Sequence, residues 1–352
     1  MAFTNIDNPE LYFQAKLYSG NASTNAITLD GSENMRPDWL WIKCRSHADS
    51  SQLFDVLRGT NALRSDDTHA DADASSNGFT SFDSDGFTLN GSNGGGNVNN
   101  SGRTYVAWNW NANGSGSSNS DGSITSSVSA NTTAGFSIVS YTGSNANSNV
   151  GTVGHGLGAA PKMLIIKDRD AGDSDWIIFH GDIGTNKQLD LNNNGAEVTN
   201  TNTWNNTAPA SSVFTIGNNS YVNNNGNDFI AYCFVEKQGY SKFGQYSGNG
   251  SNDGTYVYTG FSPSWVMTKR NDSTQNWEIY DNKRDSFNEP DGRLRANLNN
   301  AEDDQTGCDF LSNGFKWRNN NDSKNTSSAT YIYMAFAESP FVNSNGVPTN
   351  AR

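Results

Sequence analysis

The chain has 352 residues, of which 34% are hydrophobic and 11% aromatic, and its formal net charge is −13. The aromatic content excludes a disordered polar chain. The negative charge argues against a nucleic-acid partner, because contacts with phosphates require clustered Lys and Arg. The N-terminus shows no charged leader with an apolar segment, and no apolar run reaches roughly 18 residues, so we predict neither a signal peptide nor a membrane span.

The first recurring element is a short apolar segment that follows a proline. In each of three copies a lysine stands six positions after the proline, and an aromatic run begins 68 positions after it. Equal separations of this kind indicate an internal triplication. The prolines are Pro37, Pro161 and Pro263, the lysines are Lys43, Lys167 and Lys269, and the aromatic runs begin at Tyr105, Phe229 and Tyr331.

Further short apolar segments fall between these landmarks, separated by loops rich in Asn, Gly and Ser. Each repeat then holds about six strands, and no segment keeps an apolar 3.6-residue period over the length of a helix. The pattern predicts an all-β protein of three tandem antiparallel β-sandwich or barrel repeats of about 100 residues each. Each lysine ends an apolar stripe, where we expect its methylenes to cover the strand and its ammonium to reach water.

The boundaries of the repeats follow from changes in composition. The segment from residue 111 to 135 is rich in Ser, Asn and Gly, as flexible linkers are. The junction between the second and third repeats is too short to be a linker, so we expect these two to pack as one unit, with the first hinged to them. The predicted units are repeat 1 (1–110), the flexible linker (111–135), repeat 2 (136–235), repeat 3 (236–336) and a polar C-terminal tail (337–352).

The sequence offers no convincing set of catalytic residues. His155 lies between glycines, but no Ser or Cys nucleophile motif accompanies it, which favours a turn histidine. Carboxylates are plentiful, yet no pair stands out as a general acid and base. The turns at Asp83–Gly86 and Asn252–Gly254 resemble fragments of calcium loops without the distal Glu. We therefore predict a protein that is not an enzyme and needs no cofactor, with calcium as the one ion left open.

Two aromatic residues in polar surroundings, Trp204 and Tyr221, are the predicted ligand-binding residues. Trp204 lies in the wholly polar stretch Thr-Asn-Thr-Trp-Asn-Asn-Thr. Such a ring either packs against its own domain, which the composition favours, or is presented for stacking on a sugar. The three cysteines, Cys44, Cys233 and Cys308, cannot all pair, so we interpret them as buried thiols without a disulfide framework.

The ordered motifs of this chain resemble those of one known family. They are the segments 135–143 (Gly-Phe-Ser-Ile-Val-Ser-Tyr-Thr-Gly), 153–167, 229–234 and 239–250, with an opening at 8–18 and 35–43 that matches the first copy. The chain resembles a repeated domain of uncharacterised function from virion-associated, tail-fibre-like proteins of marine bacteriophages, cyanophages among them. The resemblance implies a β-sandwich in the style of lectin-like jelly rolls, displayed on the outside of a virion. It brings no catalytic residues.

Three functions from different classes compete. The first is a virion surface protein, part of a tail fibre, spike or adhesin, that binds a host-surface polysaccharide. The second is a structural component that decorates the capsid or tail without a ligand. The third, ranked last, is a polysaccharide depolymerase. The first is the prediction, with other virion proteins and further copies of the chain as partners, synthesis in the host cytoplasm and final location on the extracellular particle.

Overall fold

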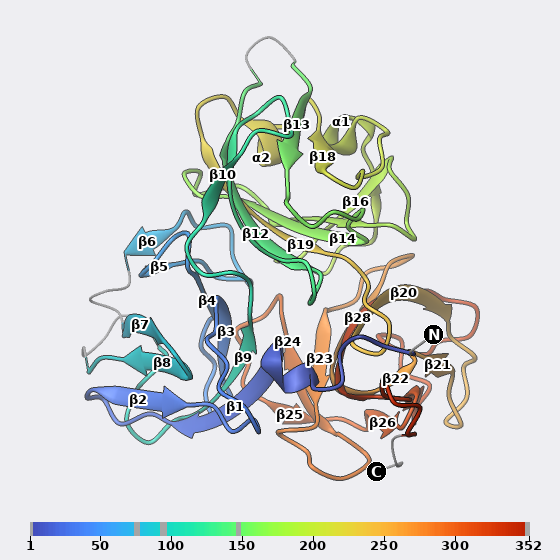
Figure 1. The fold of residues 1–352 in the computed structure, drawn as a ribbon. Coiled ribbons are helices and arrows are strands. Elements are labelled where there is room, and N and C mark those ends of the chain that lie inside the picture. Colours follow the sequence, from blue (N-terminus) through green and yellow to red (C-terminus); the bar gives the residue numbers. More distant parts are fainter. Residues whose placement is uncertain (1–2, 74–77, 92–96, 146–148, 349–352) are drawn as a thin grey trace.

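The computed structural model describes residues 3–73, 78–91, 97–145 and 149–348 (Figure 1). Its helices are single turns, namely η1 (Pro9–Leu11), α1 (Thr201–Trp204) and α2 (Ser220–Asn223). The strands of its large sheets pair antiparallel. The prediction of an all-β protein is confirmed. None of the described helices has the length and apolar character that crossing a bilayer requires.

The strands fall into three regions, which we call region 1 (residues 3–110), region 2 (111–235) and region 3 (236–348). In Figure 1 they are blue to teal, green to yellow and orange to red, and they surround a common centre. The strands of region 1 are β1 (Phe13–Ser19), β2 (Asn25–Thr28), β3 (Trp39–Cys44), β4 (Gln52–Asp55), β5 (Asn61–Ala62), β6 (Ala72–Asp73), β7 (Phe79–Asp83), β8 (Gly86–Leu89) and β9 (Thr104–Trp110). Its larger sheet has the order β1-β9-β3-β4 and its smaller sheet the order β2-β8-β7.

Regions 2 and 3 are built in a similar way. The strands of region 2 are β10 (Ser117–Asn119), β11 (Ser126–Asn131), β12 (Phe136–Thr142), β13 (Gly151–Gly154), β14 (Met163–Asp168), β15 (Ile177–His180), β16 (Lys187–Asp190), β17 (Val198–Thr199), β18 (Val213–Ile216) and β19 (Asp228–Phe234). Those of region 3 are β20 (Ser241–Ser247), β21 (Tyr256–Tyr258), β22 (Phe261–Arg270), β23 (Glu278–Asp281), β24 (Gly292–Arg295), β25 (Asp303–Asp304), β26 (Cys308–Leu311), β27 (Gly314–Trp317) and β28 (Thr330–Pro340). The larger sheets run β10-β11-β12-β19-β14-β15-β16-β17 and β20-β28-β22-β23-β24-β25, and the smaller ones are β13-β18 and β21-β27-β26.

The same pairing recurs in all three larger sheets. The strands β9, β19 and β28, which close the regions, each lie between a first strand (β1, β12 or β20) and the strand that carries the repeated lysine (β3, β14 or β22). The register is also the same, because Lys43 lies opposite Val106, Lys167 opposite Ile230 and Lys269 opposite Ile332.

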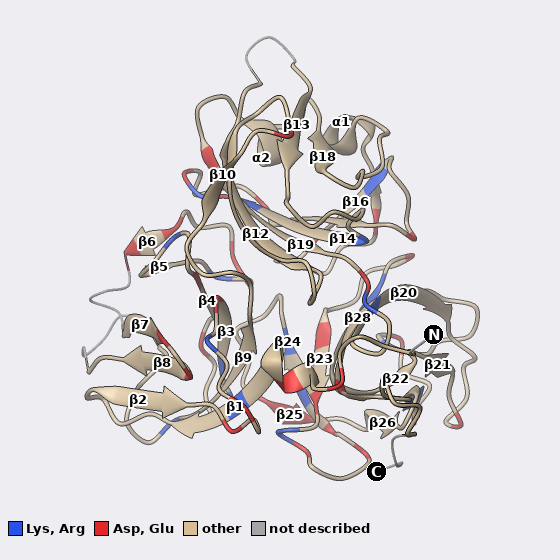
Figure 2. Ribbon diagram, viewed as in Figure 1, with Lys and Arg blue, Asp and Glu red and all other residues tan. Residues whose placement is uncertain are grey.

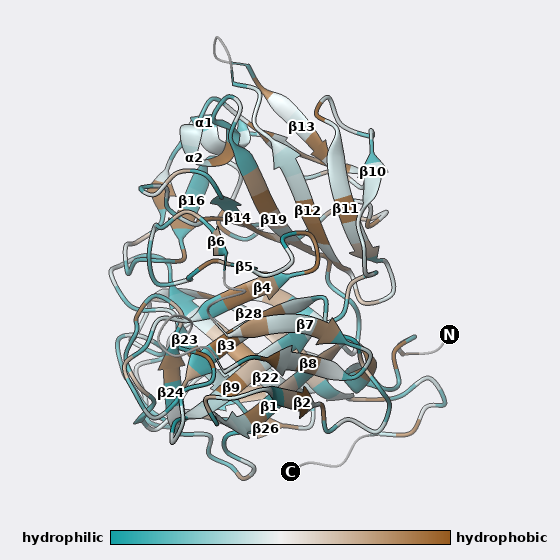
Figure 3. Cartoon of the chain, turned by 90° about the vertical axis from the view of Figure 1, so that its left-hand side faces the viewer, coloured by the Kyte–Doolittle hydropathy of each residue, from teal (hydrophilic) through white to brown (hydrophobic). Residues whose placement is uncertain are grey.

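Each smaller sheet covers one face of its larger sheet. In region 1, Ile27, Phe79 and Phe87 of the smaller sheet pack with Leu40 and Phe54 of the larger. Equivalent clusters fill regions 2 and 3. Figure 3 shows that hydrophobic residues concentrate on the strands and hydrophilic ones in the loops. Each smaller sheet also has an outer face, which points away from these clusters. The side chains on this outer face can be compared between the three regions.

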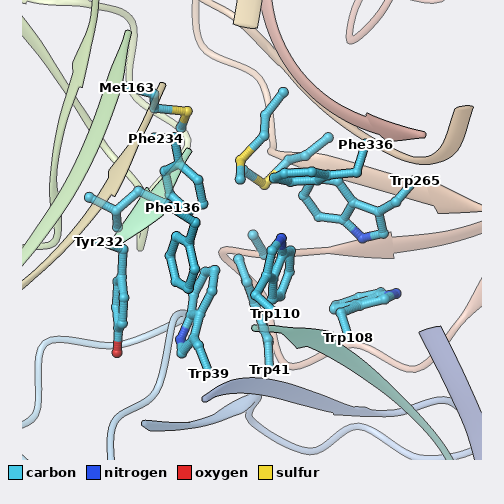
Figure 4. Close-up of a cluster of buried hydrophobic side chains, with 14 of the residues drawn as sticks. Trp39, Trp41, Trp108, Trp110, Phe136, Met163, Tyr232, Phe234, Trp265 and Phe336 are labelled. Atoms are coloured by element: carbon cyan, nitrogen blue, oxygen red, sulfur yellow. The ribbon is translucent and has the colours of Figure 1, made fainter. Parts of the chain in front are cut away.

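The other faces of the larger sheets meet in one aromatic cluster at the centre of the molecule (Figure 4). The ring of Trp39 lies 4.3 Å from that of Trp110 and 4.3 Å from that of Tyr232, so regions 1 and 2 are in direct contact. Trp110 also meets Trp265 of region 3 at 5.8 Å. Strands β3 and β14 are consequently buried along their whole length. Region 1 is therefore not hinged to the other two, contrary to the prediction.

Backbone hydrogen bonds of one kind join each region to the next. In each junction an acidic residue near a short outer strand donates its amide N–H to a carbonyl that follows the lysine of the neighbouring region, which closes the ring of regions. The three bonds are Asp71 N to Arg169 O at 2.9 Å, Glu197 N to Asn271 O at 2.8 Å and Glu302 N to Arg45 O at 2.9 Å.

Residues 111–135 are not the flexible linker that their composition predicted. They contain β10 and β11, and β11 pairs with β12 along its whole length. Val128 is 6% exposed and Ala134 is 2% exposed. The Ser-rich segment hides an alternation in which Ser126 and Val128 point inward while Ser127 points outward, and period-2 alternation is the signature of a strand. Composition alone misled the prediction.

The polar tail also begins later than predicted. Strand β28 continues past Phe336 to Pro340, and Ala337 is buried opposite Pro263 of β22. Beyond it, the Ser344 amide donates to Asp7 at 2.7 Å, which holds this segment against the N-terminal residues. Residues 349–352 of the predicted tail lie outside the described residues.

The repeated lysines do not reach water, so this prediction is wrong. Lys43, Lys167 and Lys269 are at most 1% exposed. The Lys43 ammonium donates to the carbonyl oxygens of Asp49 at 2.9 Å and Leu298 at 2.7 Å. Burial lowers the pKa of Lys43 and Lys167 to about 8 and that of Lys269 to about 7. A turn that follows each strand supplies carbonyls close enough to replace water.

Candidate functional site

The structure buries Trp204, the first predicted ligand-binding residue. It lies in α1 and is 1% exposed. Its ring packs edge-on against Phe179 at 5.5 Å, and its Nε1 donates to the Lys187 carbonyl at 2.9 Å. The neighbouring Thr203 hydroxyl donates to Gln188 at 2.5 Å, so Thr203 is buried beside the ring, while Asn202 and Asn205 stay exposed. The prediction that Trp204 binds a ligand by stacking is therefore wrong, and the packed alternative holds.

Tyr221, the second predicted residue, lies at the surface. It belongs to the single turn α2, which is capped by Asn219, and it is 37% exposed. No ring contact joins it to Trp204 in the described part of the chain. The structure therefore does not bring the two predicted residues together, and ligand binding by Tyr221 stays a prediction.

His155 and the two acidic turns are held by bonds within the protein. His155 is fully buried, its ring Nε2 lies 3.1 Å from the Ala210 carbonyl oxygen, and burial lowers its pKa. Asp83 accepts hydrogen bonds from Ser81 and Thr88, and Asp253 pairs with Lys316 at 2.5 Å. Across the described ranges, no group of three or more His, Cys, Asp or Glu side chains could hold a metal ion.

A hollow of about 410 Å³ lies where β20 and β21 run side by side at the right of Figure 1. Each of these strands is the last one of its sheet, so the hollow sits between two sheet edges. We call it the tyrosine pocket. Its lining comes from region 3 and from two loops of region 2, and it includes Lys162, Asp182, Glu236, Lys242, Gly244, Gln245, Tyr256, Tyr258 and Tyr333.

Strand alternation presents two tyrosines at this pocket. Val257 is 6% exposed and packs into the core of region 3. Because successive side chains of a strand point to opposite faces, Tyr256 and Tyr258 on either side of it point outward, at 42% and 47% exposed. The Tyr256 hydroxyl donates to the Asn313 side chain at 2.7 Å. The two rings thus share one outer face, and Tyr256 is tethered there.

Regions 1 and 2 carry small residues at the same two positions. Tyr258 lies opposite Gly314, Thr28 opposite Gly86 and Gly154 opposite Val213, each pair at the same place in its smaller sheet. Two pairs further along each ladder, Tyr256 corresponds to Ala26 and Thr152. The fold forms with alanine, threonine or glycine at these places, so packing alone does not require the tyrosines of region 3.

The floor of the pocket is a third tyrosine, Tyr333, which is 4% exposed. It lies opposite Gly244 of β20, whereas the corresponding strand pairs of the other regions hold alanine at its place, Ala107 and Ala231. A Cβ on Gly244 would lie 2.7 Å from the Tyr333 hydroxyl, too close for a contact. Burial raises the pKa of Tyr333 and of Tyr256, so both phenols are neutral at neutral pH.

Charged groups stand around the tyrosines. The Lys162 ammonium pairs with Asp182 at 2.6 Å, and Glu236 accepts the Phe243 amide at 3.0 Å. The Lys242 ammonium lies 5.5 Å from the centroid of the Tyr258 ring, in reach of a cation–π interaction. Figure 2 shows Lys and Arg scattered among Asp and Glu in this view, without a basic face.

This arrangement suits the recognition of a sugar. Exposed aromatic rings stack on the C–H faces of pyranoses, while Gln245, Lys242 and the phenol hydroxyls offer hydrogen bonds to sugar hydroxyls. Sequence reasoning missed Tyr256 and Tyr258 because a Tyr-Val-Tyr segment reads as an ordinary half-buried strand. The available signal was the alignment of the three regions, in which the same three positions read Ala-Ile-Thr at 26–28 and Thr-Val-Gly at 152–154.

The comparisons with known proteins give a family and no function. Searches of curated proteins and of solved structures each returned no match. A family model described as a domain of unknown function (DUF7483) matches residues 8–340. This match spans all three regions, including the tyrosine pocket, and so the chain belongs to the DUF7483 family.

Proposed function

We propose that the protein is a bacteriophage virion surface protein, part of a tail fibre, spike or adhesin, that binds a host-surface glycan at the tyrosine pocket. The main support for ligand binding is the exposed pair Tyr256 and Tyr258. Regions 1 and 2 have small residues at the positions that these tyrosines occupy in region 3. Exposed aromatic side chains next to polar groups in a hollow indicate a ligand-binding site rather than a role in folding. The placement on a phage particle is supported by the resemblance of the motifs.

We also propose that the three regions are copies of one unit of about 100 residues, a β-sandwich in the style of a lectin-like jelly roll. The recurring strand order and the common register of Lys43, Lys167 and Lys269 support this proposal. Copies of one unit can keep the residues that hold the fold together while one copy acquires a binding surface. The tyrosine pocket is such a surface in region 3.

The test is a binding assay with a variant that copies region 1. The double variant Tyr256→Ala/Tyr258→Thr installs the residues found at Ala26 and Thr28. We expect the intact protein to bind host cells or their extracted surface polysaccharide, and the double variant to lose at least about tenfold in affinity, since stacking contributes about 0.5–1.5 kcal/mol per ring beyond area burial. Phe287→Ala, which removes an exposed aromatic ring of region 3 outside the pocket lining, is the matched control and should leave binding unchanged.

The alternative is a structural role as a capsid- or tail-decorating protein without a ligand. This structural role is supported instead if no host polysaccharide binds the intact protein and if particles that lack the protein adsorb to host cells normally. A depolymerase would need an acid–base pair of carboxylates at the site. Asp182 and Glu236, which line the pocket, are bonded to Lys162 and to the Phe243 amide. The proposed function therefore includes no catalytic step.

A further inference from the structure

We infer that the glycan bound at the tyrosine pocket is an acidic chain, whose sugar carboxylate pairs with Lys242 while successive sugars stack on Tyr258 and Tyr256. This inference rests on the proposed function and names the class of ligand. It follows from three properties of the pocket, namely the pairing of its charges, the difference in charge between the regions and the spacing of the two rings.

Two lysines and two acids line the pocket. Lys162 and Asp182 pair with each other, whereas Lys242 and Glu236 form no ion pair among the described residues, and Glu236 accepts the Phe243 amide at 3.0 Å. Lys162 is paired with Asp182 at 2.6 Å, and Lys316, opposite Tyr256 on the same outer face, with Asp253 at 2.5 Å. In the part of the chain that the structure describes, the Lys242 ammonium forms no ion pair with a carboxylate and rests near the Tyr258 ring. An ammonium next to a stacking surface is placed to receive the negative charge of a stacked ligand.

A comparison of the three regions also favours a negatively charged ligand. The strand position of Lys242 is held by Gln14 in region 1 and Ser137 in region 2, as the registers with the closing strands show. The position of Lys316 is held by Thr88 and Thr215. Region 3 therefore gains a lysine on the outer face of its smaller sheet, Lys316, which is paired with Asp253, and an unpaired one beside that face on β20, Lys242. Where region 1 does place a lysine beside its smaller sheet, at Lys16, the ammonium is paired with Asp30.

The spacing of the rings favours a chain over a single sugar. Tyr256 and Tyr258 are two residues apart on one strand, which separates their Cα atoms by about 6.6 Å. Two stacking surfaces at that spacing can hold neighbouring sugars of a linear chain. A hexuronate carries its carboxylate directly on the sugar ring, so the charge stays next to the stacked face, where Lys242 lies.

The decisive variant is Lys242→Gln, which installs the residue of region 1. Its binding is measured by isothermal titration with polygalacturonate, with a neutral glucan of matched length and with a sulfated glucan, alongside galacturonic acid monomer. We expect the intact protein to bind polygalacturonate most tightly and the monomer at least about tenfold more weakly. Lys242→Gln should lower the polygalacturonate affinity about tenfold, the scale of one charge-assisted hydrogen bond, and leave binding of the neutral glucan unchanged.

The outcomes separate this inference from the proposed function. If the neutral glucan binds best, or if Lys242→Gln has no effect while Tyr256→Ala/Tyr258→Thr abolishes binding, the pocket is a glycan site and the acidic ligand is wrong. Preference for the sulfated glucan over polygalacturonate also overturns the carboxylate assignment. If the double tyrosine variant binds every polymer as the intact protein does, the proposed site itself fails. Binding of polygalacturonate that weakens with added salt supports the pairing with Lys242.

Discussion

Region 1 and region 3 share a scaffold and differ on one face. In both, the smaller sheet packs its inner face on the larger one through residues such as Phe87 and Phe315, which are fully buried. On the outer face, region 1 carries Ala26 and Thr28 where region 3 carries Tyr256 and Tyr258. The residues that hold the sheets together are alike, and those that meet solvent are not.

We propose that this difference separates residues needed for stability from residues needed for binding within one molecule. A residue type that recurs in every region is explained by packing, whereas one that appears in a single region at an exposed position needs another reason. The central cluster belongs to the first kind and the tyrosine pocket to the second. Variants in the two places should therefore have opposite effects, on stability in the centre and on binding at the pocket.

The largest effect is expected at the shared centre. Trp110 is fully buried and its ring meets those of Phe13, Trp39, Trp265 and Phe336. Trp110→Ala should lower the free energy of unfolding by about 3–5 kcal/mol, measured by urea denaturation. Tyr256→Ala, an exposed truncation, should change it by less than about 0.5 kcal/mol. Equal losses for both variants would contradict the division between centre and pocket.

The next effect compares two buried ion pairs at equivalent turns. Arg58 pairs with Asp55 at 2.6 Å and Arg284 with Asp281 at 2.7 Å, but Arg284 has a second acid, Glu302, at 2.8 Å.

Asp55→Ala leaves Arg58 without a carboxylate and should cost about 3–5 kcal/mol of unfolding free energy. Asp281→Ala should cost less, because Glu302 still balances the guanidinium of Arg284. Thermal and chemical denaturation of both variants measure the difference, and a larger loss for Asp281→Ala would refute it.

Region 2 has a histidine, His180, at the same turn, and this should make stability depend on pH. His180 is fully buried, and burial lowers its pKa to about 4. The unfolded chain takes up this proton below about pH 6.5, before the folded chain does. Stability present above pH 6.5 is therefore lost as pH falls through 6.5 to 4, by up to about 3 kcal/mol.

Unfolding by urea at pH 7 and at pH 4.5 measures this loss. His180→Asn keeps an acceptor for the Asp182 amide, which the imidazole Nδ1 accepts at 3.3 Å, and cannot take up a proton. The variant should lose less stability than the intact protein over this interval. An identical loss in both would assign the acid sensitivity to carboxylates.

The smallest effect is expected at the floor of the pocket. In Gly244→Ala the new Cβ would meet the Tyr333 hydroxyl at 2.7 Å and displace the ring. We expect a stability loss of about 1 kcal/mol and a few-fold loss of glycan affinity, with the melting temperature and the titration measured on the same sample. Gly172→Ala, where a Cβ would meet nothing within 4 Å, is the matched control.

Much of the fold could be predicted from sequence because it depends on spacing. The equal separations from Pro37, Pro161 and Pro263 identified strands that the structure pairs in one register. Composition was a poorer guide than alternation, since residues 111–135 look like a linker but form β10 and β11. The buried lysines were missed because carbonyls from turns and from another region, such as that of Leu298, replace the water that a lysine normally seeks.

The site could not be predicted from local pattern. Trp204 seemed isolated among polar residues, yet its ring packs on Phe179 and its Nε1 donates to the Lys187 carbonyl, contacts that the local sequence does not reveal. Tyr256 and Tyr258 seemed ordinary, and their exposure follows from their place on the outer face of the smaller sheet, on either side of the buried Val257. Comparing the three regions position by position would have singled them out, since residues that the fold requires recur in each region and these two tyrosines do not.

The most direct test of the central claim is the affinity of Tyr256→Ala/Tyr258→Thr for host-surface polysaccharide, measured beside its melting temperature. If the tyrosines of region 3 serve ligand binding, the variant keeps the melting temperature of the intact protein within about 2 °C, as a surface substitution does. Its affinity for the polysaccharide falls at least about tenfold. An unchanged affinity with a lowered melting temperature would show that the tyrosines serve the fold, and would contradict the account.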